Sequence, residues 1–310
     1  MIESSLKVNL GGINLNTPIL AASGPFAYGH EYRELIGCED LGGIIVKGIS
    51  LEPWTGNHPP RLAETASGML NSIGLQNPGL RQFLEKDLPL LRNYGPRIIV
   101  NIIGRTVDEY AAVAAGLSNA DGLDGLEVNI SCPNLEAGGL AFGTDPALTF
   151  KVVSAVRRQT TLPLLVKLSP NVTDITVIAR AAEQAGADAI SLINTLAGML
   201  IDIEEKKPLL GNIFGGLSGP AVMPVALKMV WQAAEAVNIP ILGMGGIASA
   251  EDALQFILAG ARAVAVGTGF FYNPDLARVI KKGMIDYMAA NNISNLEQIE
   301  GLARKGAERK

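Results

Sequence analysis

RIIVNIIGRTVDEYAAVAAGLSNADGLDGLEVNIS, residues 97 to 131, contains the pattern that decides the fold of this chain. It begins with one apolar run and ends with another, and the segment between them has apolar residues at helical spacing after Thr106. Continuous apolar runs of this length are typical of strands buried on both faces, and Thr often precedes a helix. The stretch therefore predicts a strand, a helix and a second strand parallel to the first.

The same pattern recurs along the whole chain. Further apolar runs predict buried parallel strands at 18–24, 42–50, 163–170, 189–195, 240–247 and 263–269. Helical spacing is found at 31–40, 77–95, 106–120, 145–160, 174–186, 221–237, 249–260 and 275–291. Eight strands alternating with eight helices predict a (β/α)8 or TIM barrel, with residues 1–310 as a single domain. A doubly wound open sheet is the alternative, but it usually has fewer strands.

Three stretches fall outside this repeat. Residues 5–18 predict an N-terminal β-hairpin that turns at Gly11 and Gly12 and closes the bottom of the barrel. Residues 51–76 and 196–218 are long, rich in Gly, Pro and Asn, and both follow strands. Because the loops after the strands form the catalytic face of such a barrel, we expect these two insertions to build or cover the site.

Composition limits the function. The chain is 48% hydrophobic and carries a formal charge of -5, which argues against nucleic acid or an anionic membrane as its main partner. Two cysteines and two histidines supply neither a disulfide framework nor a metal-ligand cluster, so no metal is expected. The first residues lack the apolar segment of a signal peptide, and no run is long enough to span a membrane. We therefore expect a cytoplasmic protein that acts on a small molecule.

Polar residues stand at the carboxyl ends of five predicted strands. They are Lys47, Asn101, Asn129, Lys167 and Asn194. A single one can simply cap a turn or reach solvent. Five at equivalent positions converge on one mouth of the barrel, where amides and two cations suit a planar, partly anionic ligand.

Glycines follow the last two predicted strands, in GMGGIASAEDA (243–253) and VGTGFF (266–271). They allow backbone N–H groups to approach a phosphate, and the helix that begins after Ser249 directs its positive end to the same region. GLSG at 216–219 offers a further backbone contact. Ordinary tight turns are the alternative, but the pattern favours the phosphate site described for barrels.

The two cysteines have different surroundings. Cys38 is interpreted as a small buried hydrophobic residue. Cys132 lies just beyond a strand end in NISCPN (129–134), before a loop that contains Gly138, Gly139 and Gly143. A shielded thiol on such a loop can act as a proton acceptor, whereas a protease-like Cys-His pair has little support.

With NSIGLQNPG (71–79), NISCPN, the two strand-end lysines and GMGGI, the chain resembles the class 1 dihydroorotate dehydrogenases over essentially its full length. The resemblance implies an FMN-binding barrel that oxidises dihydroorotate to orotate in pyrimidine biosynthesis. It implies FMN contacts from Ser23, Lys47, Gly48, Asn101, Asn129, Lys167, Ile193, Gly219, Gly245, Gly246, Gly267 and Thr268. It implies substrate contacts from Lys47, Asn71, Ser72, Ile73, Gly74, Leu75, Asn129, Asn134, Asn194 and Thr195.

In this class the active-site base is a cysteine, which here can only be Cys132. It would take the proton from carbon 5 of dihydroorotate while a hydride passes from carbon 6 to flavin N5. Lys167 would stabilise the charge that develops on the flavin, and Lys47 would offset the substrate carboxylate.

Gly48 after Lys47 resembles the NAD-linked branch of class 1, whose catalytic chain pairs with a subunit carrying FAD and an iron-sulfur cluster. A heterotetramer of two catalytic and two electron-transfer chains is the implied complex. The alternatives are the fumarate-dependent branch and a dihydropyrimidine dehydrogenase-like enzyme. Outside these, a phosphosugar lyase or isomerase with Lys167 as Schiff base, or a non-catalytic phosphate binder, would also use a barrel.

Overall fold

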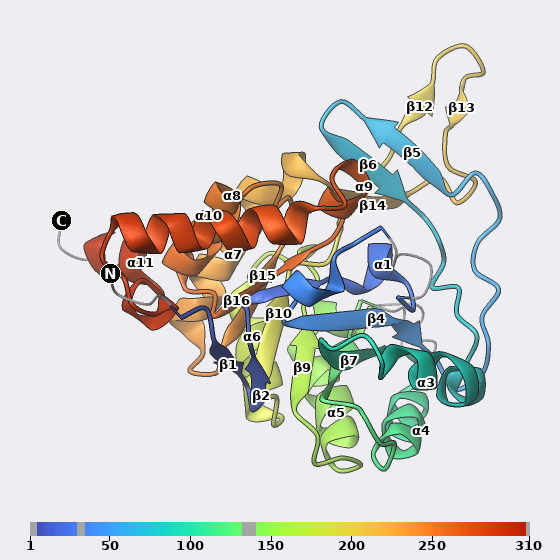
Figure 1. The fold of residues 1–310 in the computed structure, drawn as a ribbon. Helices are drawn as coiled ribbons and strands as arrows, with labels where there is room; N and C mark the ends of the chain where they lie inside the picture. The colour runs from blue at the N-terminus through green and yellow to red at the C-terminus, as the bar shows by residue number, and fades with distance from the viewer. Residues whose placement is uncertain (1–4, 30–34, 132–140, 308–310) are drawn as a thin grey trace.

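The computed structural model describes residues 5–29, 35–131 and 141–307 and confirms the predicted barrel (Figure 1). Eight parallel strands close on themselves in the spatial order β10-β15-β16-β3-β4-β7-β8-β9. Their bounds are β3 (Ile19–Ala21), β4 (Gly43–Ile49), β7 (Arg97–Ile102), β8 (Gly125–Asn129), β9 (Leu164–Lys167), β10 (Ala189–Leu192), β15 (Ile241–Met244) and β16 (Ala263–Val266). All eight lie within the apolar runs named above, and nearly all their residues are buried, as strands covered on both faces require.

Helices cover the outside of the barrel. The larger ones are α4 (Val107–Leu117), α5 (Pro146–Arg157), α6 (Ile175–Gln184), α7 (Met223–Ala236), α8 (Ala250–Ala259) and α10 (Leu276–Ala290). Side chains of Thr106, Asp145, Asp174 and Ser249 accept hydrogen bonds from backbone amides at the starts of α4, α5, α6 and α8. Shorter helices are α1 (Ser23–Phe26), α9 (Gly269–Tyr272) and α11 (Leu302–Ala307). Within the described ranges, no helix has the length and apolar character needed to cross a bilayer.

Two predicted helices differ from the structure. In the described part of 31–40, only a 3-10 turn at Cys38–Asp40 forms, so the prediction of a helix there is wrong for residues 35–40. The helix predicted at 77–95 divides into α2 (Leu80–Gln82), a π-helical turn (Phe83–Asp87) and α3 (Leu88–Leu91). Pro89 has no N–H to donate to the preceding turn, which accounts for a break in the regular α-helical ladder here.

The N-terminal hairpin forms as predicted from β1 (Val8–Leu10) and β2 (Ile13–Leu15). Gly11 and Gly12 have φ angles of 57° and 96°, as a two-residue hairpin turn of this type demands. The backbone at Gly11 lies so near the chain before β10 that a Cβ there would be 2.5 Å from the carbonyl oxygen of Asp188. Arg97, at the start of β7, donates from Nε to the carbonyl oxygen of Asn14 at 3.1 Å. The hairpin therefore covers the amino-terminal end of the barrel.

The two insertions form a second sheet that the sequence did not predict. Its antiparallel strands are β5 (Leu62–Thr65), β6 (Gly68–Asn71), β11 (Leu196–Gly198) and β14 (Gly215–Ser218), in the order β11-β14-β6-β5. The pairing of Gly216 with Asn71 joins one insertion to the other. A hairpin of β12 (Ile201–Asp202) and β13 (Lys207–Pro208) extends beyond this sheet (Figure 1).

Candidate active site

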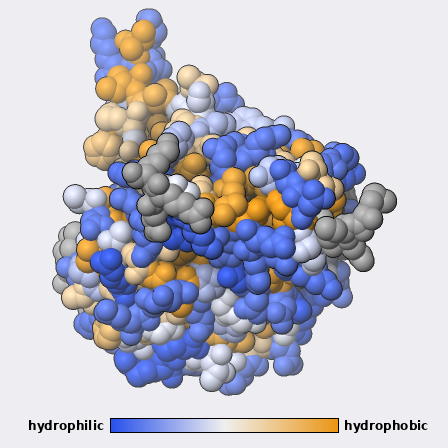
Figure 2. Space-filling view, turned by 90° about the vertical axis from the view of Figure 1, so that its left-hand side faces the viewer, coloured by the Kyte–Doolittle hydropathy of each residue, from blue (hydrophilic) through white to orange (hydrophobic). Residues whose placement is uncertain are grey.

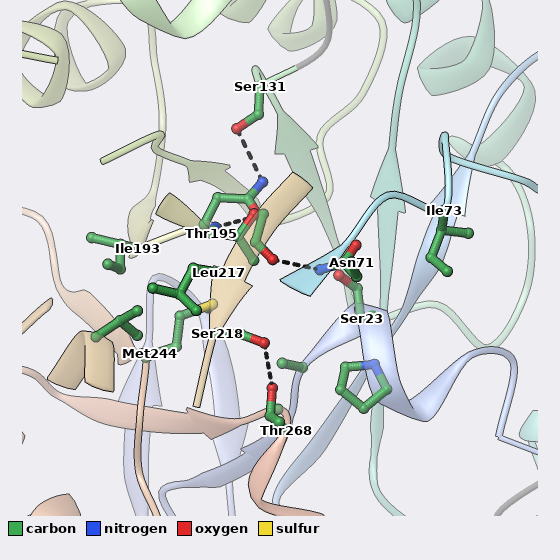
Figure 3. Close-up of a pocket in the computed structure, with 18 of the residues that line it drawn as sticks. Ser23, Asn71, Ile73, Ser131, Ile193, Thr195, Leu217, Ser218, Met244 and Thr268 are labelled. Atoms are coloured by element: carbon green, nitrogen blue, oxygen red, sulfur yellow. Dashed lines mark hydrogen bonds between the residues drawn. The ribbon is translucent and has the colours of Figure 1, made fainter. Parts of the chain in front are cut away.

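A cavity of about 690 Å³ lies between the carboxyl ends of the barrel strands and the second sheet. Its walls come from strand ends such as Asn129 and Lys167 and from sheet residues such as Leu62 and Leu217. Figure 3 shows Asn71 and Ser23 on one side and Ile193 and Met244 on the other. The volume falls within the range of about 300–1,000 Å³ that is usual for ligand sites. As expected, the two insertions build one wall of this cavity.

The structure brings nearly all the predicted site residues together. The predicted FMN and substrate residues that line the cavity are Ser23, Lys47, Gly48, Asn71, Ser72, Ile73, Gly74, Leu75, Asn101, Asn129, Lys167, Ile193, Asn194, Thr195, Gly219, Gly245, Gly246, Gly267 and Thr268. Cys132 and Asn134 lie outside the described residues. Ser131 and Ala141, on either side of that segment, both line the cavity. Cys38 is buried away from it, in agreement with its predicted structural role.

A buried polar cluster lies behind the wall of the cavity. Glu127, on β8, is fully buried and accepts hydrogen bonds from Asn101 Nδ2 at 2.5 Å and Ser191 Oγ at 2.7 Å. Lys167 Nζ lies 4.0 Å from Oε2 of the same carboxylate. The hydrogen bonds from Asn101 and Ser191 satisfy the buried carboxylate, and the ammonium at 4.0 Å offsets its charge. Glu127 was not predicted as a site residue, although an acidic residue inside the apolar run GLEVNIS is a visible signal.

A second polar group surrounds the end of β8. Asn194 Nδ2 donates to Ser131 Oγ at 3.0 Å and approaches Asn129 Oδ1 at 3.3 Å. Asn129 Oδ1 also accepts from the backbone N–H of Ser131 at 3.2 Å. Tyr110 donates its hydroxyl to the carbonyl oxygen of Asn129 at 2.6 Å. These contacts hold the end of β8 and Ser131, the residue before Cys132.

Lys47 and Gly48 both line the cavity although they are neighbours in β4. Successive residues of a regular strand point to opposite faces. The pairing of β4 with β7 shifts in register between Val46 and Ile49, which is the mark of a β-bulge or a similar irregularity. This irregularity allows both residues to face the cavity.

The glycine loops after β15 and β16 form the other end of the cavity. Gly245 and Gly246 have φ angles of 124° and 80°, which explains why glycine is needed there. Thr268 Oγ1 donates to Ser218 Oγ at 2.8 Å, which joins the loop after β16 to the second sheet (Figure 3). One of the backbone N–H groups at the start of α8 already has a partner within the protein, since Ser249 Oγ accepts from the N–H of Asp252 at 3.1 Å.

Sequence reasoning also missed polar residues of the lining itself, such as Asn171 and Ser169. Asn171 donates from Nδ2 to Ser169 Oγ and to the carbonyl oxygen of Thr195, and its Oδ1 accepts from the N–H of Ala197. It thus joins the loop after β9 to the loop after β10. Among the described residues, no group of three or more His, Cys, Asp or Glu side chains is arranged to hold a metal ion.

Comparisons with known proteins agree with this geometry. Residues 5–288 match the sequence model of the family Dihydroorotate dehydrogenase. A protein of Alkaliphilus metalliredigens named "Dihydroorotate dehydrogenase B (NAD(+)), catalytic subunit" is 54% identical over 301 residues, 97% of this chain and 99% of that protein. A protein of Thermoanaerobacter pseudethanolicus with the same name is 51% identical over 96% of this chain and 98% of its own length.

A solved structure supports the fold independently. The dihydroorotate dehydrogenase of Eimeria tenella, crystallised with ferulenol, superposes with a TM-score of 0.79 at 23% identity, over 96% of this chain and 88% of that one. The resemblance inferred from the sequence, including its NAD-linked branch, is confirmed by the names of the relatives. With a barrel of the right topology and a sequence match that extends from the N-terminal hairpin into α10, the chain belongs to the dihydroorotate dehydrogenase family.

Proposed function

We propose that this protein oxidises dihydroorotate to orotate in pyrimidine biosynthesis, with FMN bound in the cavity and NAD as the final electron acceptor through a partner subunit. The observation that carries the proposal is the convergence of Lys47, Asn129, Lys167 and Asn194 on one cavity in a chain of this family. Two cations and two amides provide the charges and hydrogen bonds that a planar ring system and a carboxylated pyrimidine need.

The residues present fit FMN. Asn101 Oδ1 is buried and has no hydrogen-bond partner, so it offers an acceptor for a ligand N–H such as that of the flavin pyrimidine ring. A Cβ on Gly267 would lie 3.7 Å from its nearest neighbour, Pro25, and one on Gly24 would have no neighbour within 4 Å. These open glycine faces, with Gly246 and Thr268, leave backbone and hydroxyl groups accessible to a phosphate.

When bound, FMN supplies the acceptor for the substrate hydride. Lys167 would place its cation beside the pyrimidine edge of the ring, where negative charge accumulates on reduction. Lys47 would bind the substrate carboxylate, and the amides of Asn71, Asn129 and Asn194 would bind the polar edges of the substrate ring. Ser72 to Leu75, Asn134 and Thr195 would complete the substrate contacts.

Cys132 would remove the proton from carbon 5 of dihydroorotate. That carbon is next to a carbonyl, which acidifies its proton, and a positioned general base is then sufficient. The support from the described residues is that Ser131, the residue before Cys132, lines the cavity and is hydrogen-bonded to Asn194. The chain therefore enters the segment that contains Cys132 from a point beside the proposed substrate contacts.

NAD as the final electron acceptor is supported by the names of the relatives, which are catalytic subunits of an NAD-linked enzyme. A catalytic subunit needs a partner, and the sequence carries neither a dinucleotide-binding fingerprint nor enough cysteines for an iron-sulfur cluster. We propose a cytoplasmic heterotetramer in which two such chains each deliver electrons to a subunit with FAD and an iron-sulfur cluster.

The test is anaerobic mixing of the purified, FMN-loaded chain with dihydroorotate while the flavin absorbance is followed. We expect rapid bleaching and formation of one orotate per flavin. Dihydrouracil, which lacks the carboxylate that Lys47 would bind, is the matched control and should bleach the flavin far more slowly. Faster reduction by dihydrouracil than by dihydroorotate would replace the proposal by a dihydropyrimidine dehydrogenase-like function.

A further inference from the structure

A fully buried carboxylate lies behind the cavity without touching it. Glu127 has no exposed surface and is not among the cavity-lining residues, yet it contacts two residues that are, Asn101 and Lys167. Such a group costs free energy to bury unless all its hydrogen bonds are made. Its position on β8, inside the barrel, therefore calls for a role beyond packing.

The register of the barrel explains how these side chains meet. Glu127 pairs with Asn101 across β8 and β7, while Lys167 pairs with Ser191 across β9 and β10. The four residues thus come from four neighbouring strands and point to the same side of the sheet, toward the barrel interior. Both carboxylate oxygens are occupied, Oε1 by Ser191 and Oε2 by Asn101, with Lys167 4.0 Å away.

The carboxylate fixes the orientation of the Asn101 amide. A carboxylate can only accept hydrogen bonds, so the Nδ2 group must face Glu127 and the Oδ1 atom must face away from it. That oxygen is buried without a partner and lies near Gly48, where a Cβ would be 2.9 Å from it. Asn101 is therefore held as an acceptor toward the ligand and cannot present its donor.

The same carboxylate balances the charge of Lys167. Lys167 Nζ is the cation that lies within ion-pair distance of Glu127, and its side chain is only 7% exposed. A negative charge at this distance in a poorly solvated interior reduces the field of the ammonium at the cavity. It thereby opposes the accumulation of negative charge on a bound flavin during reduction.

We infer that Glu127 is a positioning residue that sets the hydrogen-bonding polarity of Asn101 and the net charge behind Lys167, and so sets the reduction potential of the bound flavin. This inference rests on the proposed binding of FMN in the cavity. It assigns Glu127 no contact with cofactor or substrate. Ser191, which donates to the other carboxylate oxygen, stabilises the same negative charge from behind.

Two substitutions should move the potential in opposite directions. Glu127→Gln keeps the size of the side chain but removes its charge, so the FMN-loaded chain should favour reduced over oxidised flavin about tenfold more, a rise of about 30 mV for a two-electron couple. Ser191→Ala removes the hydroxyl dipole that offsets part of the carboxylate charge, so more of that negative charge acts on the flavin and the potential should fall. The measurement is a spectroscopic redox titration of the full chain against a reference dye.

Asp87→Asn is the matched control, because Asp87 is also a buried carboxylate but lies in the π-helical turn at Phe83–Asp87 and not in a barrel strand. It should leave the potential unchanged. The inference is overturned if Glu127→Gln shows no rise or if Asp87→Asn produces the same one. Should Glu127→Gln fail to fold or retain FMN, Ser191→Ala decides, and an unchanged or raised potential there overturns the inference. A parent chain that binds no FMN would instead refute the proposed function.

Discussion

Most of the residues that we assign to the reaction lie at or next to the end of a strand. Asn129 and Lys167 are the last residues of β8 and β9, and Asn194 is two residues beyond β10. At these points the barrel holds the backbone while the side chain is free to face a ligand. Such positions are visible in the sequence because a polar residue ends an apolar run.

Glu127 was harder to predict, since its position inside a run and not at its end gives no clue to its partners. Those partners, Asn101, Ser191 and Lys167, come from three other strands, and only the register of the barrel brings them together. Sequence spacing does not contain that register.

The role of Cys132 can be tested by a single substitution. Cys132→Ala should leave FMN binding intact and slow flavin reduction by dihydroorotate by about 100-fold or more, the scale expected for loss of a general base. Cys38→Ala is the matched control, since Cys38 is buried outside the cavity, and it should reduce its flavin at the parent rate. A Cys132→Ala variant as fast as the parent would remove the thiol from the mechanism.

The phosphate end of the proposed FMN site can be tested at Gly267. The space around this residue accommodates a Cβ, whereas one at Gly246 would lie 2.7 Å from the Cβ of Met223 and disturb the fold. Gly267→Asp should therefore weaken FMN binding by charge repulsion, by about tenfold or more relative to the isosteric Gly267→Asn. Equal dissociation constants for the two variants, measured by flavin fluorescence, would argue against a phosphate beside Gly267.

Among the helices and strands, those that local sequence patterns determine were predicted correctly. The eight barrel strands, the N-terminal hairpin and the capped helices all follow from runs, spacings and caps of fewer than about 20 residues. The second sheet could not be predicted in this way. Its strands have three or four residues each, and several of those residues are glycines. Strand β14 pairs with β6 across about 145 residues of chain. Only tertiary contacts stabilise strands so short.

The cap of α6 gives a prediction about pH. Hydrogen bonds from the hydroxyl and then the backbone N–H of Thr176, with a smaller effect of Arg180, lower the pKa of Asp174 below its ordinary value of 3.8. A folded-state pKa below the unfolded value contributes stability that is present above pH 3.8 and is lost as the pH falls through the folded value. Asp174→Ala should therefore melt about 2 °C below the parent at pH 7, as expected for one exposed cap.

The difference between the two melting temperatures should shrink as the pH falls below 3.8, because the parent then loses the charged cap as well. Asp174→Asn is the control, because an asparagine keeps an acceptor at this position without a titrating group. Its melting temperature should follow that of the parent at pH 7. A difference between parent and Asp174→Ala that grew on acidification would contradict this account of the cap.

At the scale of the whole molecule, the barrel closes one end with the N-terminal hairpin and builds its site at the other. The second sheet and the β12–β13 hairpin lie on the site side and give that end a large, irregular surface (Figure 1). Figure 2 shows apolar residues on the surface, and Ile203 and Phe214, in and near this hairpin, are 80% and 62% exposed.

The electron acceptor of the chain should depend on whether its partner subunit is present. The FMN-loaded chain alone should oxidise dihydroorotate with an artificial dye but should not reduce NAD, because it carries no nicotinamide-binding fingerprint. Addition of the partner subunit should confer NAD reduction, with electrons passing from FMN through the cluster to FAD. It should also raise the melting temperature of the chain, because binding that covers apolar surface stabilises the folded state.

The deciding assay compares NAD, fumarate and dye as acceptors for the chain alone. Rapid, saturable turnover with fumarate and no partner would move the protein to the fumarate-dependent branch, while the assignments of Cys132 and the FMN site would stand.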